Sequence, residues 1–217
     1  MKELAVIDVD VWADVRCPWC WIGLRRLPRT TTELGEPVRL RRRSFLLEPR
    51  GPVSPGQPTA AVATSEWGMT IAQWESKSQR IRAEGRGEGL DINVDGALMF
   101  DSSPLHRLLK LVAAAKPSRA GAAWDAAFVA HFGRTENLGD WDVLRSMAAV
   151  WGLDPAGVER ALVGESFAED VARDLADAQR LQVNSVPTIV ARDGSQISGT
   201  ASAGELVRFL TGAGSIR

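Results

Sequence analysis

Apolar and polar residues alternate near the start of the chain. Ile7, Val9 and Val11 are separated by two aspartates, a pattern that predicts a β-strand over residues 4–13. The same aspartates interrupt any continuous apolar run, so we do not interpret this segment as a secretory signal peptide. The first element is therefore expected to be a strand with one apolar face.

A second strand is predicted over residues 38–45, with Leu40 and Phe45 as apolar positions. Three basic residues share one of its faces: Arg39, Arg41 and Arg43. A nucleic-acid or phosphate site would be accompanied by aromatic stacking partners or a wider basic field, and neither is present. We therefore expect this face to be solvated or covered by another part of the chain.

Residues 61–182 have the apolar spacing of helices. The predicted helical segments are 66–84, one beginning near Pro104, 120–132, 141–151, 155–163 and 168–181. In the first of them an apolar stripe is expected to face the core: Trp67, Ile71, Trp74 and Ile81. Asp140 and Asp154 stand where N-caps belong. A Pro- and Gly-rich connection over 48–60 precedes this block.

The C-terminal part returns to strands. Pro187 opens an apolar run that ends before a turn at Asp193-Gly194, and a partner strand is predicted over 196–198. A closing helix is predicted over 205–210, with Leu206, Phe209 and Leu210 packed on the sheet. A helical block lying between strands predicts an α/β fold.

Composition narrows the function. The 217 residues suit one large domain or a domain with an insertion, and the formal net charge is −1. Such a balance lacks the broad basic surface that nucleic acids or anionic membranes bind, so we expect neither as a partner. No apolar stretch is long enough for a membrane-spanning helix. We expect a cytoplasmic protein.

The chain has two cysteines, arranged Cys17-Pro18-Trp19-Cys20. Two thiols are too few for a disulfide scaffold, and a structural zinc site needs about four ligands. His106 and His131 are far from the pair in sequence and lack ligand-like spacing, so we predict no metal site. A redox-active dithiol is the interpretation that remains.

The local sequence around the thiols supports redox chemistry. Cys17 follows a strand and precedes a helix predicted from residue 18 to about residue 27, with Pro18 at the first helical position. Free N–H groups and the positive end of the helix dipole stabilise a thiolate there, and Arg16 adds positive charge. Cys17 is the expected nucleophile, and Cys20, one turn further, is close enough to resolve a mixed disulfide.

These features together resemble a known family. The matching segments are Asp14–Gly23, Phe45–Pro49, His106 and Val183–Thr188. They resemble the DsbA family of thioredoxin-fold oxidoreductases, and more narrowly its FrnE-like cytosolic branch. The resemblance implies a thioredoxin-like fold with a large inserted all-helical domain. Residues 1–60 and 183–217 would form the thioredoxin-like domain, and residues 61–182 the insertion.

The resemblance also implies roles for individual residues. Cys17 would be the nucleophile and Cys20 the resolving thiol, exchanging disulfides with protein or small-molecule substrates. Pro187 would be a cis-proline facing Cys17, and the backbone of Val186 would pair with a substrate or glutathione strand. Trp19 would tune the thiols. No tightly bound cofactor is implied beyond the redox-active disulfide, with glutathione as a possible co-substrate.

Alternatives remain open at this point. Kappa-class transferases and hydroxychromene carboxylate isomerases, which use glutathione, resemble the same architecture but typically carry Ser where Cys17 stands. A third hypothesis is a redox-sensing module whose disulfide forms without catalysing exchange. His106 is either a base near the thiols or an ordinary helix residue, and Asp14 either relays protons to Cys20 or caps the strand end.

Overall fold

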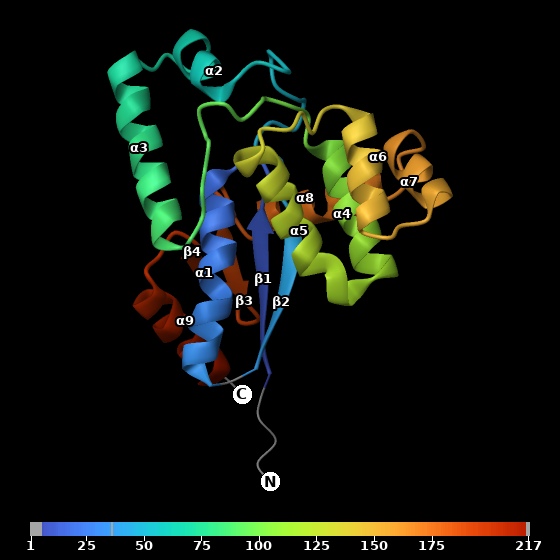
Figure 1. Cartoon of the computed structure of the whole chain (residues 1–217). Helices are drawn as coiled ribbons and strands as arrows, with labels where there is room; N and C mark the ends of the chain where they lie inside the picture. Colours follow the sequence, from blue (N-terminus) through green and yellow to red (C-terminus); the bar gives the residue numbers. More distant parts are fainter. Residues whose placement is uncertain (1–5, 36, 216–217) are drawn as a thin grey trace.

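A four-stranded sheet forms the centre of the molecule (Figure 1). The computed structural model describes residues 6–35 and 37–215, with side chains through residue 212. The strands lie in the order β2-β1-β3-β4. Their bounds are β1 Ile7–Ala13, β2 Val38–Ser44, β3 Thr188–Ala191 and β4 Gln196–Ser198. β1 pairs with β2 in parallel, whereas β3 is antiparallel to both β1 and β4. The predicted α/β class is confirmed.

The alternation read in the first strand separates the two faces of the sheet. Ile7, Val9 and Val11 belong to the core that α1 (Pro18–Leu34) and α9 (Ala203–Ser215) complete. Trp12 points to the opposite face, where its indole donates a hydrogen bond to the carbonyl of Asp174. The strand prediction is confirmed from residue 7, and residues 4 and 5 lie outside the described residues.

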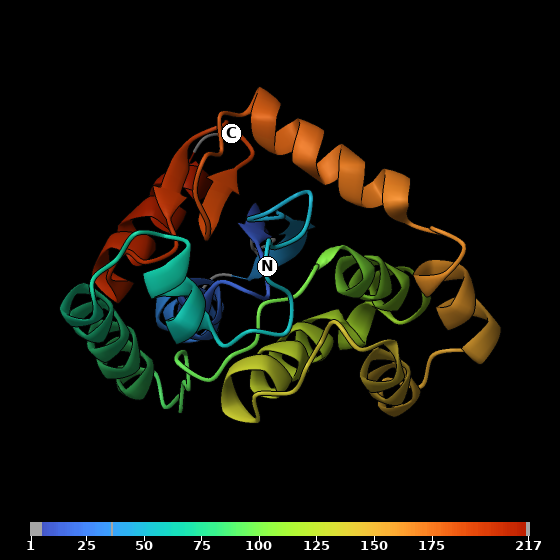
Figure 2. The same ribbon diagram turned by 90° about the horizontal axis from the view of Figure 1, so that it is seen from above.

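Helices from the middle of the chain are arranged around the sheet (Figure 2). They are α2 Thr59–Ser65, α3 Ile71–Gly87, α4 Ser103–Ala115, α5 Ala120–Phe128, α6 Trp141–Val150, α7 Pro155–Leu162 and α8 Ala168–Arg180. The predicted N-caps hold, since Asp140 and Asp154 accept hydrogen bonds from amides of the helices they precede. The inserted domain was predicted over residues 61–182, whereas α2 begins at Thr59 and α8 ends at Arg180. The division into two domains stays a prediction.

The helix predicted over 66–84 is wrong at its start. The helical conformation is interrupted between α2 and α3, where Gly68 has a φ of +66°. Thr70 then begins α3 with a capping box to Gln73, which fixes the helix start later than the apolar spacing suggested. Trp67 and Ile71 are consequently 43% and 70% exposed, and only the later members of the predicted stripe are buried.

Two further helices differ from expectation. α1 continues to Leu34, beyond the predicted end near residue 27, although it contains Pro28. Leu27 and Thr30 are buried on the side that packs inward, so packing outweighs the hydrogen bond that proline removes. The segment predicted as one helix over 120–132 ends as α5 at Phe128 and continues as a π-helical turn over Val129–Gly133.

The basic face of β2 is partly covered by α8. Arg43 pairs with the buried carboxylate of Asp174 at 2.8 Å, and Lys110 reaches the same carboxylate from α4. Arg39 and Arg41 remain mostly exposed beside Asp8 and Asp10. The expectation that this face is solvated or covered by another part of the chain is therefore confirmed, with Arg39 and Arg41 solvated and Arg43 covered.

Candidate functional site

The cysteine pair lies where β1 passes into α1. The amide of Cys17 donates to the carbonyl of Asp14 at 3.0 Å, which closes a turn after the strand. Cys17 has extended backbone angles and is the N-cap of α1, with Pro18 opening the helix. No acidic side chain occupies the first turn, so the positive end of the helix dipole is not neutralised there. The predicted placement of the motif is confirmed.

The two thiols have different surroundings. Both are free, and Cys17 retains 6% exposure whereas Cys20 has none. The amide of Cys20 donates to the carbonyl of Cys17 at 3.0 Å, which stacks the second thiol one turn behind the first. Burial, followed by the neighbouring Cys17 thiol, raises the pKa of Cys20 well above its ordinary value. Cys20 is therefore a protonated, shielded thiol at neutral pH.

The loop before β3 faces Cys17. The Val186–Pro187 peptide bond is cis. The Sγ of Cys17 lies 3.5 Å from the carbonyl oxygen of Val186, although 169 positions separate the two residues in sequence. The carbonyl of Pro187 accepts a hydrogen bond from the amide of Gly199 at 2.8 Å, which holds the loop against the turn before α9. The fold thus brings together Cys17, Val186 and Pro187.

A buried carboxylate lies behind the cysteines. Asp14 is fully buried and accepts hydrogen bonds from the amides of Arg16 and Leu47, at 3.1 and 2.8 Å. The Ser102 hydroxyl donates to it at 3.3 Å, and Nε2 of His106 lies 3.4 Å away. Burial acts to raise the pKa of Asp14, but the His106 ring and the two amides outweigh it and lower that pKa. The carboxylate is ionised at neutral pH.

Comparison with known proteins identifies the family. The family model of the DSBA-like thioredoxin domain matches residues 8–211. The chain belongs to this family. Among curated proteins, no match is found.

Several solved structures share the fold of this chain. A probable DsbA oxidoreductase from Streptomyces coelicolor is 28% identical, with a TM-score of 0.88 over 97% of this chain and 91% of its own. The cytosolic disulfide reductase DsbM from Pseudomonas aeruginosa is 17% identical, with a TM-score of 0.61 over 96% of each chain. A 2-hydroxychromene-2-carboxylate isomerase is 16% identical, with a TM-score of 0.67 over 96% and 95%. The last two likenesses show the fold alone.

Arg16 and Trp19, also singled out from the sequence of this DsbA-like chain, contact other parts of the molecule. The guanidinium of Arg16 lies 2.5 Å from the Glu48 carboxylate, so its positive charge beside Cys17 is largely balanced. Trp19 is half-buried, and the guanidinium of Arg80 from α3 stands over its ring at 5.4 Å. Arg16 is therefore built into the wall of the site, and Trp19 borders it.

Three residues that support the proline loop, Gly23, Arg26 and Gly199, were given no role by sequence reasoning. A side chain added at Gly23 would come within 2.6 Å of the Gly199 carbonyl oxygen, and one at Gly199 within 2.6 Å of the Pro187 ring. Arg26 is buried and donates to the carbonyl of Ala201 at 2.8 Å, tying the turn to α1. A glycine within an otherwise apolar helical face was the available signal, because it marks a close approach.

Within residues 6–35 and 37–215, no three His, Cys, Asp or Glu side chains are grouped as a metal site. None of the helices described has the length and apolar character needed to cross a bilayer.

Proposed function

We propose that this DsbA-like chain catalyses thiol–disulfide exchange with Cys17 as nucleophile and Cys20 as resolving thiol. The observation that carries the proposal is the position of Cys17 at the N-cap of α1, 3.5 Å from the Val186 carbonyl, with the buried Cys20 one turn behind. One thiol is thereby presented to a substrate and the other is protected from it.

The reaction follows from this asymmetry. The Cys17 thiolate attacks one sulfur of a substrate disulfide, forms a mixed disulfide and expels the other sulfur as a thiolate. Cys20 then loses its proton and attacks the Sγ of Cys17, which releases the second substrate thiol. The substrate gains two electrons, and the protein is left with a Cys17–Cys20 disulfide. Two molecules of a thiol such as glutathione restore the dithiol: the first forms a mixed disulfide with Cys17, and the second attacks that disulfide and leaves with the first as oxidised glutathione.

The cis-proline loop supplies the substrate surface in this proposal. Val186 precedes the paired stretch of β3, so its backbone groups lie outside the sheet ladder. An extended substrate segment or glutathione would pair with this backbone by strand addition, which aligns its sulfur with Cys17. We place the exchange in the cytoplasm, in keeping with DsbM, a structural neighbour described as a cytosolic disulfide reductase.

Glutathione-dependent isomerisation is the competing function. A 2-hydroxychromene-2-carboxylate isomerase shares the fold, and DsbM has a structure with glutathione. Retention of both thiols favours redox exchange, because an isomerase that activates glutathione has no use for a resolving cysteine.

Equilibration in graded glutathione buffers tests the proposal. Trp19 and Trp21 flank Cys20, so their fluorescence should follow the Cys17–Cys20 couple, with endpoints checked by thiol alkylation. A potential below about −250 mV would make the protein a reductant, and one above about −200 mV an oxidant or isomerase. If no internal disulfide forms and glutathione stays bound, the isomerase reading replaces the proposal.

Two variants give an independent test. Cys17→Ser is expected to abolish turnover of a disulfide substrate, because no sulfur remains to attack it. Cys20→Ser is expected to accumulate the mixed disulfide, visible as an added mass that dithiothreitol removes. Full isomerase activity in Cys20→Ser together with no trapped substrate would contradict the redox mechanism.

A further inference from the structure

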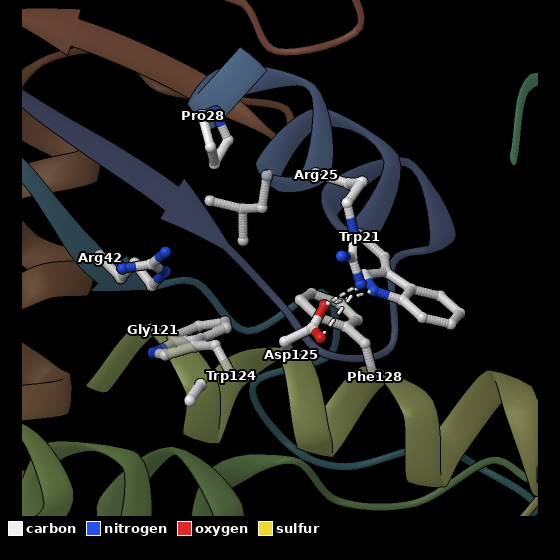
Figure 3. Close-up of a pocket in the computed structure, with 10 residues that line it drawn as sticks. Trp21, Arg25, Pro28, Arg42, Gly121, Trp124, Asp125 and Phe128 are labelled. Atoms are coloured by element: carbon white, nitrogen blue, oxygen red, sulfur yellow. Dashed lines mark hydrogen bonds and ion pairs between the residues drawn. The ribbon is translucent and has the colours of Figure 1, made fainter. Parts of the chain in front are cut away.

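A cavity of about 240 Å³ lies between α1, β2 and α5, away from the thiols (Figure 3). Trp21 and Arg25 line it from α1, Arg42 from β2, and Trp124 and Phe128 from α5. Its lining includes neither cysteine nor the proline loop. The residues that α1 contributes are spaced three or four apart, so they share one helix face.

Arg42 breaks the pattern of the strand that carries it. It pairs in register with the core residue Val11 of β1 and lies on the same face of β2 as Leu40, which packs against the core. Gly121 at the start of α5 makes room for the guanidinium, because a side chain added there would come within 3.1 Å of it. A cation at an inward-facing strand position is the kind of local inconsistency expected at a functional site.

The Arg42 guanidinium has no bonding partner among the residues that the structure describes. It makes no hydrogen bond or ion pair there, and its Nε is buried. The nearby carboxylate of Asp125 is already engaged by the Trp21 indole at 3.0 Å and by Arg25 at 2.8 Å. Burial lowers the pKa of Arg42, and only the charge of Asp125 opposes this. Arg42 is half-buried, and its buried Nε is left without a hydrogen bond, which is costly, so an anion bound beside the guanidinium would be favoured.

A second cavity, of about 340 Å³, borders the first and also contains Arg42 and Trp124. Its other cations are already paired, because Arg41 and Arg43 contact Asp10, and Lys110 contacts Asp174. Arg42 is therefore the cation of these two cavities that is left for a bound group within the described part of the chain.

Aromatic rings form the wall opposite Arg42. Trp21 is stacked on Phe128 with the ring centroids 6.1 Å apart, and Trp124 lies against the same ring at the same separation. Pro28 also lines the cavity, and proline has no N–H to donate to the carbonyl of Leu24 four residues earlier, another lining residue. The cavity thus combines one unpaired cation, apolar rings and a carbonyl without its helical donor.

We propose that this cavity binds a small organic anion, whose carboxylate or phosphate pairs with Arg42 and whose ring lies against Trp124 and Phe128. The volume sets the size of the ligand. Pockets for drug-sized ligands occupy roughly 300–1,000 Å³, so about 240 Å³ suits a single aromatic ring with its charged group.

Calorimetric titration of the full chain tests the proposal with four probes: benzoate, phenyl phosphate, inorganic phosphate and the neutral benzyl alcohol. The two aromatic anions are expected to bind, and benzyl alcohol at least tenfold more weakly, because it cannot pair with Arg42. Comparable binding of inorganic phosphate alone would mean that the rings contribute nothing, which would overturn the assignment of an organic ligand.

Variants locate the binding. Arg42→Met is expected to weaken both aromatic anions at least tenfold, whereas Arg39→Met, on the same strand but outside the cavity, should leave them unchanged. Ala122→Leu narrows the cavity from an exposed lining position and keeps Arg42, so it tests the site even if Arg42→Met fails to fold. Equal affinity in Ala122→Leu and the unmodified protein, or no binding of any anion at millimolar concentration, would overturn the proposal.

The cavity is independent of the redox proposal. Cys17→Ser should bind benzoate and phenyl phosphate as the unmodified chain does, because Cys17 does not line the cavity. Loss of disulfide exchange with retained anion binding would contradict neither proposal, and loss of anion binding in Cys17→Ser would show that the probes occupy the thiol site instead.

Discussion

The pKa values of the two buried acids behind the site are shifted in opposite directions by their surroundings. Cys20 has a raised pKa because it is fully buried and faces the Cys17 thiol, whereas hydrogen bonds and the His106 ring hold the pKa of Asp14 low despite its burial. The charge of Asp14 adds to the shift at Cys20. Resolution of a mixed disulfide should therefore accelerate as pH rises, because Cys20 must lose a proton to attack.

Asp14→Asn separates the two roles that the sequence left open. If Asp14 acts only through its charge and hydrogen bonds, the variant should resolve the mixed disulfide with a pH profile moved to lower pH. If Asp14 accepts the proton of Cys20, the variant should be slower at every pH. Quenched-flow measurement with a fluorescent disulfide distinguishes these profiles. Asp101→Asn, an exposed acid before α4, should leave the profile unchanged.

The second pH prediction concerns His131 and the free energy of unfolding. Burial lowers its pKa to about 3, and its ring packs against Phe100 with the centroids 5.1 Å apart. Between roughly pH 6.5 and 3 the unfolded chain binds a proton that the folded protein does not, so the free energy of unfolding should fall as pH falls, by up to about 1.4 kcal/mol per pH unit.

In His131→Phe this contribution should vanish. Urea unfolding at pH 7, 6 and 5 is expected to give a flatter pH dependence than in the unmodified protein. The same pH dependence of the free energy of unfolding in both proteins would contradict this prediction, because other groups would then set the loss of stability at low pH.

At the scale of elements, the position of helix α1 depends on its close packing against the loop that contains Pro187. Gly23 faces the Gly199 carbonyl oxygen and the Pro187 ring, so α1 can lie near the loop only where no side chain intervenes. The distance between Cys17 and Val186 depends on this packing, because Cys17 begins the same helix.

Gly23→Ala should therefore lower stability by about 1–3 kcal/mol through overpacking and reduce the rate of disulfide exchange. The matched control is Gly212→Ala in α9, where an added side chain meets no atom within 4 Å. Both positions are helical, and without any packing effect alanine stabilises a helix by up to about 1 kcal/mol relative to glycine. Chemical unfolding should therefore show a lower free energy of unfolding for Gly23→Ala and a higher one for Gly212→Ala. A stabilised, fully active Gly23→Ala would contradict the packing argument.

At the scale of the molecule, one buried carboxylate connects the helical region to the sheet. Asp174 of α8 accepts from the amide of Ser44 at 2.6 Å and pairs with Arg43 of β2 and Lys110 of α4. Its side chain is 2% exposed, so the three partners have little water available to replace it. The arrangement holds three elements that are distant in sequence.

Asp174→Ala is expected to cost about 3–5 kcal/mol, because Lys110 would lose its carboxylate partner, Arg43 would keep only Asp10 and Asp177, and the buried amide of Ser44 would lose its acceptor. Asp170→Ala, which removes an exposed pair with Arg173 on the same helix, should cost less than about 1 kcal/mol. The difference is measured by urea unfolding. Equal effects of the two variants would mean that α8 is held by its apolar contacts alone.

The sequence by itself determined the features that depend on neighbouring residues. Alternation in β1, proline after Cys17, the two aspartate caps and the resemblance around Cys-Pro-Trp-Cys were all readable, because they act within one turn or one strand. It failed at Gly68 and Pro28, where a local capping box in one case and tertiary packing in the other decided the helix bounds.

Only the tertiary structure decided what meets across long separations. The approach of Cys17 to Val186, the pairing of Arg16 with Glu48, and the position of Arg42 beside Asp125 join segments between about 30 and 170 residues apart. Side-chain packing of α1, α5 and the sheet sets these contacts, and spacing along the chain carries no information about which faces pack together.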